Sequence, residues 1–191
     1  MDAPSRLAPA LSTFTLTKGD GRVYSIRTVE VAHHDPTLIK TVVDIDLMTY
    51  SEQTFSRYTA GLMLRHGRTF LLTAEEVPIG TCQCIRSWER PTEAMMFSMA
   101  IRPGWRGRGL GTRFLTGVLD ALRRQGIRSV TLMVAAGNKA GMAIYRRSFG
   151  FEVVQELPNE FGNGEVQLLM RKELNADAPV RPLPPAPRSD E

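Results

Sequence analysis

The 191-residue chain has few cysteines and no long apolar run. Its two cysteines, Cys82 and Cys84, lie one residue apart, with no second pair to complete a zinc site, so we expect reduced thiols on one face of a strand. No apolar stretch approaches the roughly 18 residues that a membrane helix needs. The first residues also lack the basic and apolar segments of a secretory signal. These absences predict a cytoplasmic protein with no metal site and no membrane partner.

Positive charge is concentrated in the middle of the chain. Residues 86–147 carry 12 Lys and Arg against 3 Asp and Glu, a net charge of +9. Residues 1–85 have a net charge of −1, and residues 148–191 one of −4. This distribution favours an anionic ligand bound by the middle segment. Because no helix-turn-helix, zinc-finger or aromatic-rich RNA-binding pattern accompanies the charge, we favour a polyphosphate ligand over nucleic acid.

The chain length fits one domain bounded by two irregular ends. Residues 1–20 contain two prolines and scattered polar residues, which predicts a flexible N-terminal arm. Residues 175–191 contain five prolines, which predicts a disordered tail. The domain then extends over residues 21–174, with no internal repeat.

Hydrophobic periodicity within this domain predicts strands and helices in alternation. We expect seven strands, at residues 22–31, 69–73, 77–85, 94–101, 129–135, 151–157 and 165–170. We expect four helices, at residues 36–50, 51–64, 110–125 and 138–149. Because alternating elements are flanked by hairpin-like strand pairs, the predicted fold is a single α/β domain, with a mixed central sheet of about six to seven strands flanked by about four helices.

A glycine-rich loop joins the fourth predicted strand to the third predicted helix. It reads Arg106-Gly107-Arg108-Gly109-Leu110-Gly111. Glycines let the backbone approach a ligand closely, and the N–H groups of a first helical turn favour an anion. Arg106 and Arg108 add donors suited to phosphate. The loop lacks the Gly-Lys-Ser/Thr ending of a nucleotide P-loop and the spacing of a Rossmann fingerprint.

This loop resembles the acetyl-CoA motif of the GNAT superfamily, Gln/Arg-x-x-Gly-x-Gly/Ala, through Arg106, Gly109 and Gly111. The resemblance continues downstream and covers about residues 49–172. It includes Asn138, Ala143, Tyr145 and Phe149-Gly150-Phe151. It implies the GNAT fold and an N-acetyltransferase that uses acetyl-CoA as co-substrate.

The resemblance also implies roles for individual residues. The backbone of Met99, Ala100 and Ile101 would hold the pantetheine arm, and one of their N–H groups would stabilise the oxyanion. Asn138 would contact the cofactor arm, although it could instead only cap the following helix. Tyr145 would protonate the departing thiolate, although it could be a core aromatic. The pyrophosphate would be held by Arg106, Gly107, Arg108, Gly109, Leu110, Gly111 and Thr112.

Several local strings are similar to bacterial enzymes that acetylate the N-terminal alanine of a ribosomal protein. They lie at residues 50–55, 97–111, 162–165 and 168–170. This similarity implies a protein or peptide N-terminus as the acceptor amine. A small-molecule amine (a polyamine, amino acid or antibiotic) and a non-catalytic acyl-CoA-binding module are the alternatives. A homodimer is left open.

The chain departs from these enzymes at the general base. Met133 stands where they carry a glutamate, so another group must accept the proton of the amine. The candidates are Glu93, Glu52 and a water chain to solvent. We expect direct attack of the amine on the thioester, with neither cysteine acetylated.

Overall fold

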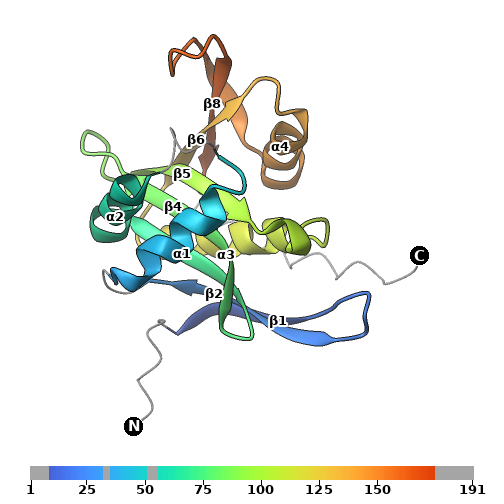
Figure 1. Ribbon diagram of the computed structural model, residues 1–191. Helices are drawn as coiled ribbons and strands as arrows, with labels where there is room; N and C mark the ends of the chain where they lie inside the picture. Colours follow the sequence, from blue (N-terminus) through green and yellow to red (C-terminus); the bar gives the residue numbers. More distant parts are fainter. Residues whose placement is uncertain (1–8, 32–34, 51–55, 175–191) are drawn as a thin grey trace.

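The computed structural model describes residues 9–31, 35–50 and 56–174, which form one mixed sheet with helices on both faces (Figure 1). The strand order is β1-β2-β3-β4-β5-β6-β8-β7, and only β5 and β6 run parallel among the described neighbours. The strands are β1 Ala10–Thr17, β2 Val23–Glu30, β3 Arg68–Ala74, β4 Val77–Arg86, β5 Glu93–Ile101, β6 Ser129–Ala135, β7 Glu152–Pro158 and β8 Val166–Glu173.

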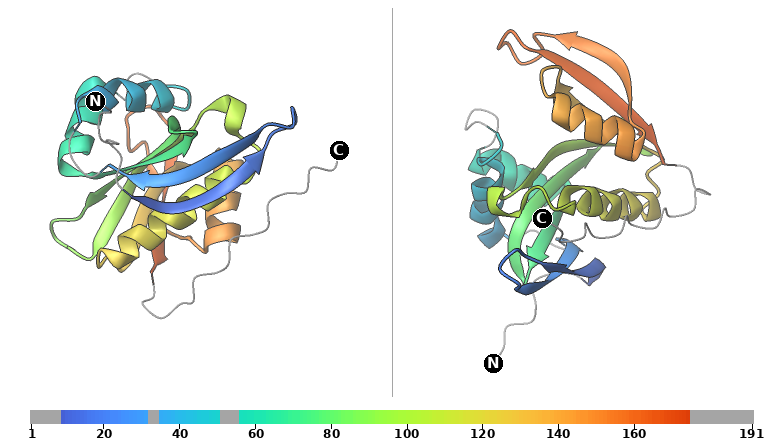
Figure 2. Two further views of the ribbon diagram at one scale, coloured as in Figure 1. Left: turned by 90° about the horizontal axis from the view of Figure 1, so that it is seen from below. Right: turned by 90° about the vertical axis from the view of Figure 1, so that its right-hand side faces the viewer.

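The helices divide between the two faces of this sheet. Figure 2 (left) shows α1 and α2 on one side of the strands and α3 on the other. None of the described helices is both long and apolar enough to cross a membrane. The helices are α1 Thr37–Asp46, α2 Arg57–His66, α3 Leu110–Arg124 and α4 Lys139–Ala143, with a 3₁₀ turn at Pro103–Trp105 and a π turn at Ile144–Ser148.

These elements confirm the predicted α/β domain with four helices, but the sheet has eight strands. The additional strand is β1. A flexible arm was predicted over residues 1–20, and this prediction was wrong for residues 10–17, which form the strand. The prolines of this segment precede the strand, and Gly19 lies in the turn after it. Leu16 is buried, and the guanidinium of Arg113 lies 4.7 Å from the ring centre of Phe14. Residues 1–8 and the predicted tail at 175–191 lie outside the described residues.

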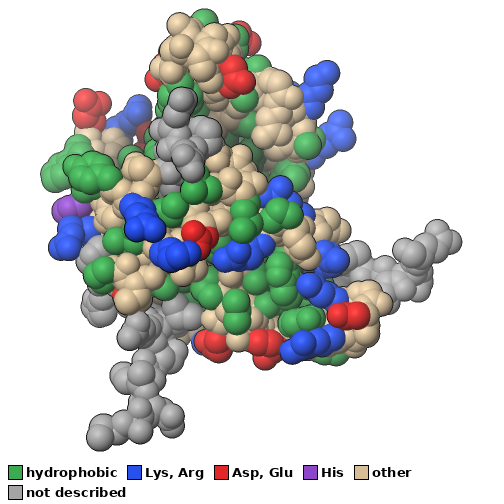
Figure 3. Space-filling view, viewed as in Figure 1, with side chains coloured by type: hydrophobic (Ala, Val, Ile, Leu, Met, Phe, Trp, Pro, Cys, Tyr) green, Lys and Arg blue, Asp and Glu red, His purple; other side chains and the backbone are tan. Residues whose placement is uncertain are grey.

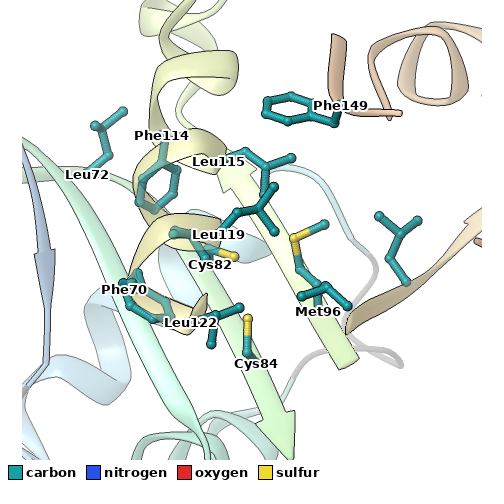
Figure 4. Close-up of a cluster of buried hydrophobic side chains, with 14 of the residues drawn as sticks. Phe70, Leu72, Cys82, Cys84, Met96, Phe114, Leu115, Leu119, Leu122 and Phe149 are labelled. Carbon is teal, nitrogen blue, oxygen red and sulfur yellow. The ribbon is translucent and has the colours of Figure 1, made fainter. Parts of the chain in front are cut away.

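The larger core lies between α3 and the sheet. Figure 4 shows side chains of α3 interleaved with those of β3, β4 and β5. Cys82 and Cys84 point into this core and are both free thiols. Because side chains alternate along a strand, Thr81 and Gln83 face the opposite side of the sheet, which α1 and α2 cover. The labelled residues are Phe70, Leu72, Cys82, Cys84, Met96, Phe114, Leu115, Leu119, Leu122 and Phe149.

Helix α3 also supports the N-terminal hairpin. A Cβ added at Gly117 would lie 3.4 Å from Ser12 Oγ and from Thr28 Cγ2. These are ordinary van der Waals distances, so the helix packs directly on β1 and β2 at Gly117. The hairpin and the helix that begins at the glycine-rich loop therefore form one packed unit.

Candidate active site

The two parallel strands of the sheet separate in the middle of the domain. β5 pairs with β6 only from Glu93 to Met96. A β-bulge follows, because Gln83 of β4 pairs with Ser98 while the next residue, Cys84, pairs with Met96. Figure 2 (right) shows α4, β7 and β8, coloured orange to red, on the far side of this separation. Beyond the bulge, β5 has a partner strand on its β4 side alone.

The backbone of Met99 faces the unpaired side of β5. Its N–H donates to the Tyr50 hydroxyl at 3.1 Å, and that hydroxyl donates to the Met99 carbonyl at 3.2 Å. Along a strand the backbone groups of successive residues point to alternate sides, so Ile101 shares this edge while Ala100 faces β4. Of the three predicted pantetheine contacts, Met99 and Ile101 are therefore in position, and Ala100 is not.

Tyr50 was not predicted as a site residue, although the string that contains it was noted. It follows α1 and reaches β5 because its N–H donates to the Asp46 carbonyl at 2.8 Å, which extends the helix by one turn. Burial raises the pKa of Tyr50 to about 12. The hydroxyl therefore keeps its proton and serves Met99 as both donor and acceptor.

The glycine-rich loop presents backbone donors at the start of α3. Gly107 and Gly109 have φ angles of +76° and +68°, and a Cβ at either would meet no atom within 4 Å. The first helical bond runs from the Arg113 N–H to the Gly109 carbonyl at 3.2 Å. Within the described chain, the N–H groups of residues 109–112 donate to no other residue. Together with the helix dipole, these groups form an anion site with open space before it.

The two arginines of the loop donate hydrogen bonds to neighbouring groups of the protein. Arg106 Nε donates to the Ile101 carbonyl at 2.7 Å, and its Nη2 donates to Thr49 Oγ1 at 2.8 Å. Arg108 Nη1 donates to the Arg106 carbonyl at 3.0 Å and to the Gly104 carbonyl at 3.3 Å. Both guanidinium groups thus stabilise the loop, and their contact with a pyrophosphate stays a prediction. Figure 3 shows Lys and Arg side chains over this part of the surface.

An aromatic contact fixes the loop against the N-terminal hairpin. The rings of Trp105 and Tyr24 lie edge to face with centres 5.0 Å apart. Lys18 Nζ lies 3.8 Å from the centre of the Trp105 ring. Trp105 therefore packs against protein, and Lys18 adds a cation beside the loop.

Tyr145 lies on the other side of the strand separation. Its ring is half-buried and packs edge to face on Phe151, with centres 5.8 Å apart. Burial raises the pKa of the Tyr145 phenol above its usual value, and the Tyr50 hydroxyl and the Cys82 thiol raise it further. The ring contact with Phe151 meets the core alternative for Tyr145, and its contact with a departing thiolate stays a prediction.

Asn138 begins the short helix that carries Tyr145. Its side-chain oxygen accepts a hydrogen bond from the Gly141 N–H at 2.9 Å. The helix-cap alternative is therefore present in the structure, and it leaves the side-chain amide N–H groups for another partner.

Glu93 lies at the wrong end of β5 to act as the base. It is six residues before Met99, about 20 Å along an extended strand. Its buried carboxylate pairs with Arg171, accepts from Arg90 Nη2 at 2.9 Å and lies 3.3 Å from Ser129 Oγ. It therefore ties β5 to β6 and β8, and we withdraw it as a candidate base. Glu52 lies outside the described residues.

The structure shows a different acid near the separated strands. Asp46 is fully buried at the end of α1, and neither of its carboxylate oxygens has a hydrogen-bond partner among the described residues. Burial raises the pKa of Asp46 to about 8. The burial of Asp46 could be predicted from helical periodicity, because Asp46 follows the buried Val42 by four residues and so lies on the same face of the helix.

We predict that Glu93→Gln lowers stability without changing the pH dependence of turnover. The substitution leaves Arg171 without its buried partner, which should cost about 1–3 kcal/mol. Thermal unfolding and acetyl-CoA turnover from pH 6 to 9 measure the two effects. Loss of the acidic limb of the pH profile, with unaltered stability, would restore Glu93 as the base.

The chain is similar in sequence to proteins named as acetyltransferases. Three proteins illustrate the similarity. An uncharacterized N-acetyltransferase of Methanocaldococcus jannaschii is 26% identical over 152 residues, which cover 75% of this chain and 65% of that protein. The L-methionine sulfoximine/L-methionine sulfone acetyltransferase of Pseudomonas aeruginosa is 32% identical over 90 residues, covering 46% and 50%.

The third is the ribosomal protein bS18-alanine N-acetyltransferase of Escherichia coli, 37% identical over 59 residues, which cover 31% of this chain and 39% of that protein. A crystal structure of the ribosomal-protein-S18-alanine N-acetyltransferase from E. coli aligns with 80% of this chain and 99% of that one, with a TM-score of 0.64 and 20% identity. The sequence matches thus span less than two thirds of each curated relative.

A family model described as Acetyltransferase (GNAT) family matches residues 36–151, which include α1, the separated strands, the loop and Tyr145. The predicted resemblance is thereby confirmed, and the chain belongs to the GNAT acetyltransferase family.

Proposed function

We propose that the protein is an acetyl-CoA-dependent N-acetyltransferase that acts on a primary amine by direct attack. One observation carries the proposal: the unpaired edge of β5 ends at the open anion site that begins α3. A ligand with an amide-containing arm and a pyrophosphate needs this pair of features side by side. Family membership supplies the identity of that ligand, because GNAT proteins use acetyl-CoA.

The residues present fit such a ligand. The Met99 N–H and carbonyl offer a strand-like donor and acceptor, which Tyr50 now satisfies. The N–H groups of residues 109–112 have no acceptor within the described chain and suit a pyrophosphate. Acetyl-CoA would supply the activated acyl group, and this chain would bind and orient it.

The side chains support a mechanism without an acetylated enzyme. Cys82 and Cys84 are buried in the α3 core, and a hydrogen bond with Cys84 together with burial raises the pKa of the Cys82 thiol well above its usual value. Neither thiol is a nucleophile in this state. We propose that the Met99 N–H stabilises negative charge on the carbonyl oxygen and that the protonated Tyr145 hydroxyl donates to the departing sulfur.

We propose a protein or peptide N-terminus as the acceptor. The similarity to the bS18-alanine enzyme supports this choice. A small-molecule amine is the second candidate, because the similarity to the methionine sulfoximine enzyme is of comparable extent. An α-amine is common to both candidates, and its pKa near ~8 makes deprotonation easier than for a lysine or polyamine nitrogen near ~10.

An acceptor panel separates these candidates. We expect free thiol release with peptides that begin with a small residue, and slower release with amino acids and polyamines. Equal or faster turnover of amino acids would favour the small-molecule function. Tight acetyl-CoA binding with no turnover of any acceptor would favour a non-catalytic binding module.

We predict that Gly111→Asp weakens acetyl-CoA binding at least about tenfold relative to wild type. A Cβ at Gly111 would make ordinary contacts of 3.7–3.8 Å with Ile101 and Met99, and an acid in the first helical turn favours the helix, so folding should be preserved. Gly111→Asn is the matched neutral control. Calorimetry with both variants isolates charge repulsion, and equal affinities for Asp and Asn would contradict an anion site here.

We predict that Tyr145→Phe lowers turnover by about 10²–10⁴-fold and leaves acetyl-CoA affinity within about twofold. The phenyl ring keeps the edge-to-face contact with Phe151 and removes only the hydroxyl. Steady-state kinetics and calorimetry on the same preparation measure both quantities. Wild-type turnover in this variant would make Tyr145 a packing residue only.

A further inference from the structure

The Tyr50 hydroxyl occupies the backbone groups that the proposed function requires. It accepts a hydrogen bond from the Met99 N–H at 3.1 Å and donates one to the Met99 carbonyl at 3.2 Å. In an antiparallel sheet, the residue opposite on the neighbouring strand makes these same two bonds. A hydroxyl can replace that residue because it is both a donor and an acceptor. One tyrosine side chain therefore takes the place of a missing strand beside β5.

The Met99 N–H cannot serve Tyr50 and a ligand equally well. A backbone N–H has one hydrogen to donate, whereas a carbonyl oxygen can accept two hydrogen bonds. The proposed contact with the thioester carbonyl oxygen needs that hydrogen, and so does a strand-like contact with the pantetheine arm. The Met99 carbonyl could bind an arm beside Tyr50. The N–H becomes available to a ligand only when the Tyr50 hydroxyl moves away.

The chain around Tyr50 holds its ring at this edge in the ligand-free protein. The backbone N–H groups of Thr49 and Tyr50 both donate to the Asp46 carbonyl at 2.8 Å. Arg106 Nη2 donates to Thr49 Oγ1 at 2.8 Å, and Arg106 Nε donates to the Ile101 carbonyl at 2.7 Å. Arg106 thereby fastens the residue before Tyr50 to the same strand. The contact between the phenol and β5 is thus built into the fold around α1.

The Tyr50 ring can nevertheless leave without disrupting a core. It is half-buried and lies at the margin of the smaller core, which contains Val42 and Val43 of α1 and Leu71 of β3. A rotation about the side-chain torsions of Tyr50 changes its rotamer and releases both groups of Met99. The backbone bonds that hold Tyr50 at the end of α1 need not break.

We propose that Tyr50 closes the ligand-free site and that the arm of acetyl-CoA displaces it. This inference rests on the proposed acetyltransferase function and adds a conformational step to it. In the free protein the hydroxyl satisfies Met99, and in the complex the ligand takes over both bonds while the ring turns away. No covalent bond changes in this step. Tyr50 stabilises only the free state, so it lowers the affinity for acetyl-CoA by the same factor.

The test compares acetyl-CoA with adenosine 3′-phosphate 5′-diphosphate, a nucleotide that carries the phosphates of CoA but lacks its arm. Tyr50→Phe keeps the ring and removes only the hydroxyl that bonds Met99. Tyr58→Phe is the matched control, because Tyr58 is exposed on α2. Calorimetry measures the affinity of each protein for both ligands.

We expect Tyr50→Phe to bind acetyl-CoA at least about fivefold more tightly than wild type, which corresponds to about one hydrogen bond. Its affinity for the armless nucleotide should stay within about twofold of wild type. Tyr58→Phe should match wild type for both ligands. A merely structural role for Tyr50 predicts the opposite sign, because a loosened site binds acetyl-CoA more weakly.

Thermal unfolding of the same proteins gives a second readout. Without ligand, Tyr50→Phe should melt at least about 2 °C below wild type, because the Met99 N–H and carbonyl lose their partner. Saturating acetyl-CoA should remove this difference, because the arm then satisfies Met99 in both proteins. The saturating nucleotide should leave the difference in place.

Fluorine NMR follows the ring in the wild-type sequence. The chain has four tyrosines, so a protein labelled with 3-fluorotyrosine gives few resonances. Phe substitutions at Tyr24, Tyr58 and Tyr145 assign the Tyr50 resonance by elimination, even if Tyr50→Phe does not fold. Acetyl-CoA should shift the Tyr50 resonance, and the nucleotide should leave it in place.

The outcomes separate the two proposals. Equal or weaker acetyl-CoA binding by Tyr50→Phe would mean that the hydroxyl stays at Met99 in the complex, and would overturn the displacement. A Tyr50 resonance that acetyl-CoA does not shift would overturn it as well. Either result leaves the proposed function intact if the wild-type protein uses acetyl-CoA. Failure of the wild-type protein to bind acetyl-CoA would overturn the proposed function and this inference together.

Discussion

The site depends on one backbone constraint, the loss of strand pairing on one side of β5 after Met96. Polar backbone groups inside a protein must find partners, and here the sheet no longer supplies them. Tyr50 satisfies both groups of Met99, and Arg106 satisfies the Ile101 carbonyl. Arg106 also binds Thr49, so the chain after α1 is fastened to the open edge by two side chains. An arm that pairs with this edge must displace or share Tyr50.

The same arrangement explains why the loop offers backbone rather than side-chain donors. The guanidinium groups of Arg106 and Arg108 are used to hold loop and strand carbonyls. The positive φ angles of Gly107 and Gly109 turn the chain tightly into α3, and the first N–H groups of the helix have no acceptor within the described chain. Some of the basic residues in segment 86–147 therefore stabilise the loop through hydrogen bonds. The positive charges of the segment together also produce a favourable electrostatic potential for an anion.

Local patterns predicted the fold well because periodicity and turn residues are local properties. Seven strands and four helices lie where their apolar spacing indicates, whereas β1 was missed because Pro9 and Gly19 border it closely. The loop and Tyr145 could be assigned from motifs that are continuous in sequence. Tyr50 and Arg106 could not, because their roles depend on which carbonyl lies within reach after the chain folds.

The two buried acids, Glu93 and Asp46, also differ in a way that local sequence patterns cannot predict. Glu93 and Asp46 both lie beside apolar residues in sequence, and nothing local distinguishes them. In the fold, Glu93 lies where three strands meet and receives arginine partners from β8 and the β4–β5 connection. Asp46 is the last residue of α1, where the described residues provide no hydrogen-bond partner for its carboxylate. One acid therefore ties strands together through ion pairs, whereas burial without a partner raises the pKa of the other to about 8.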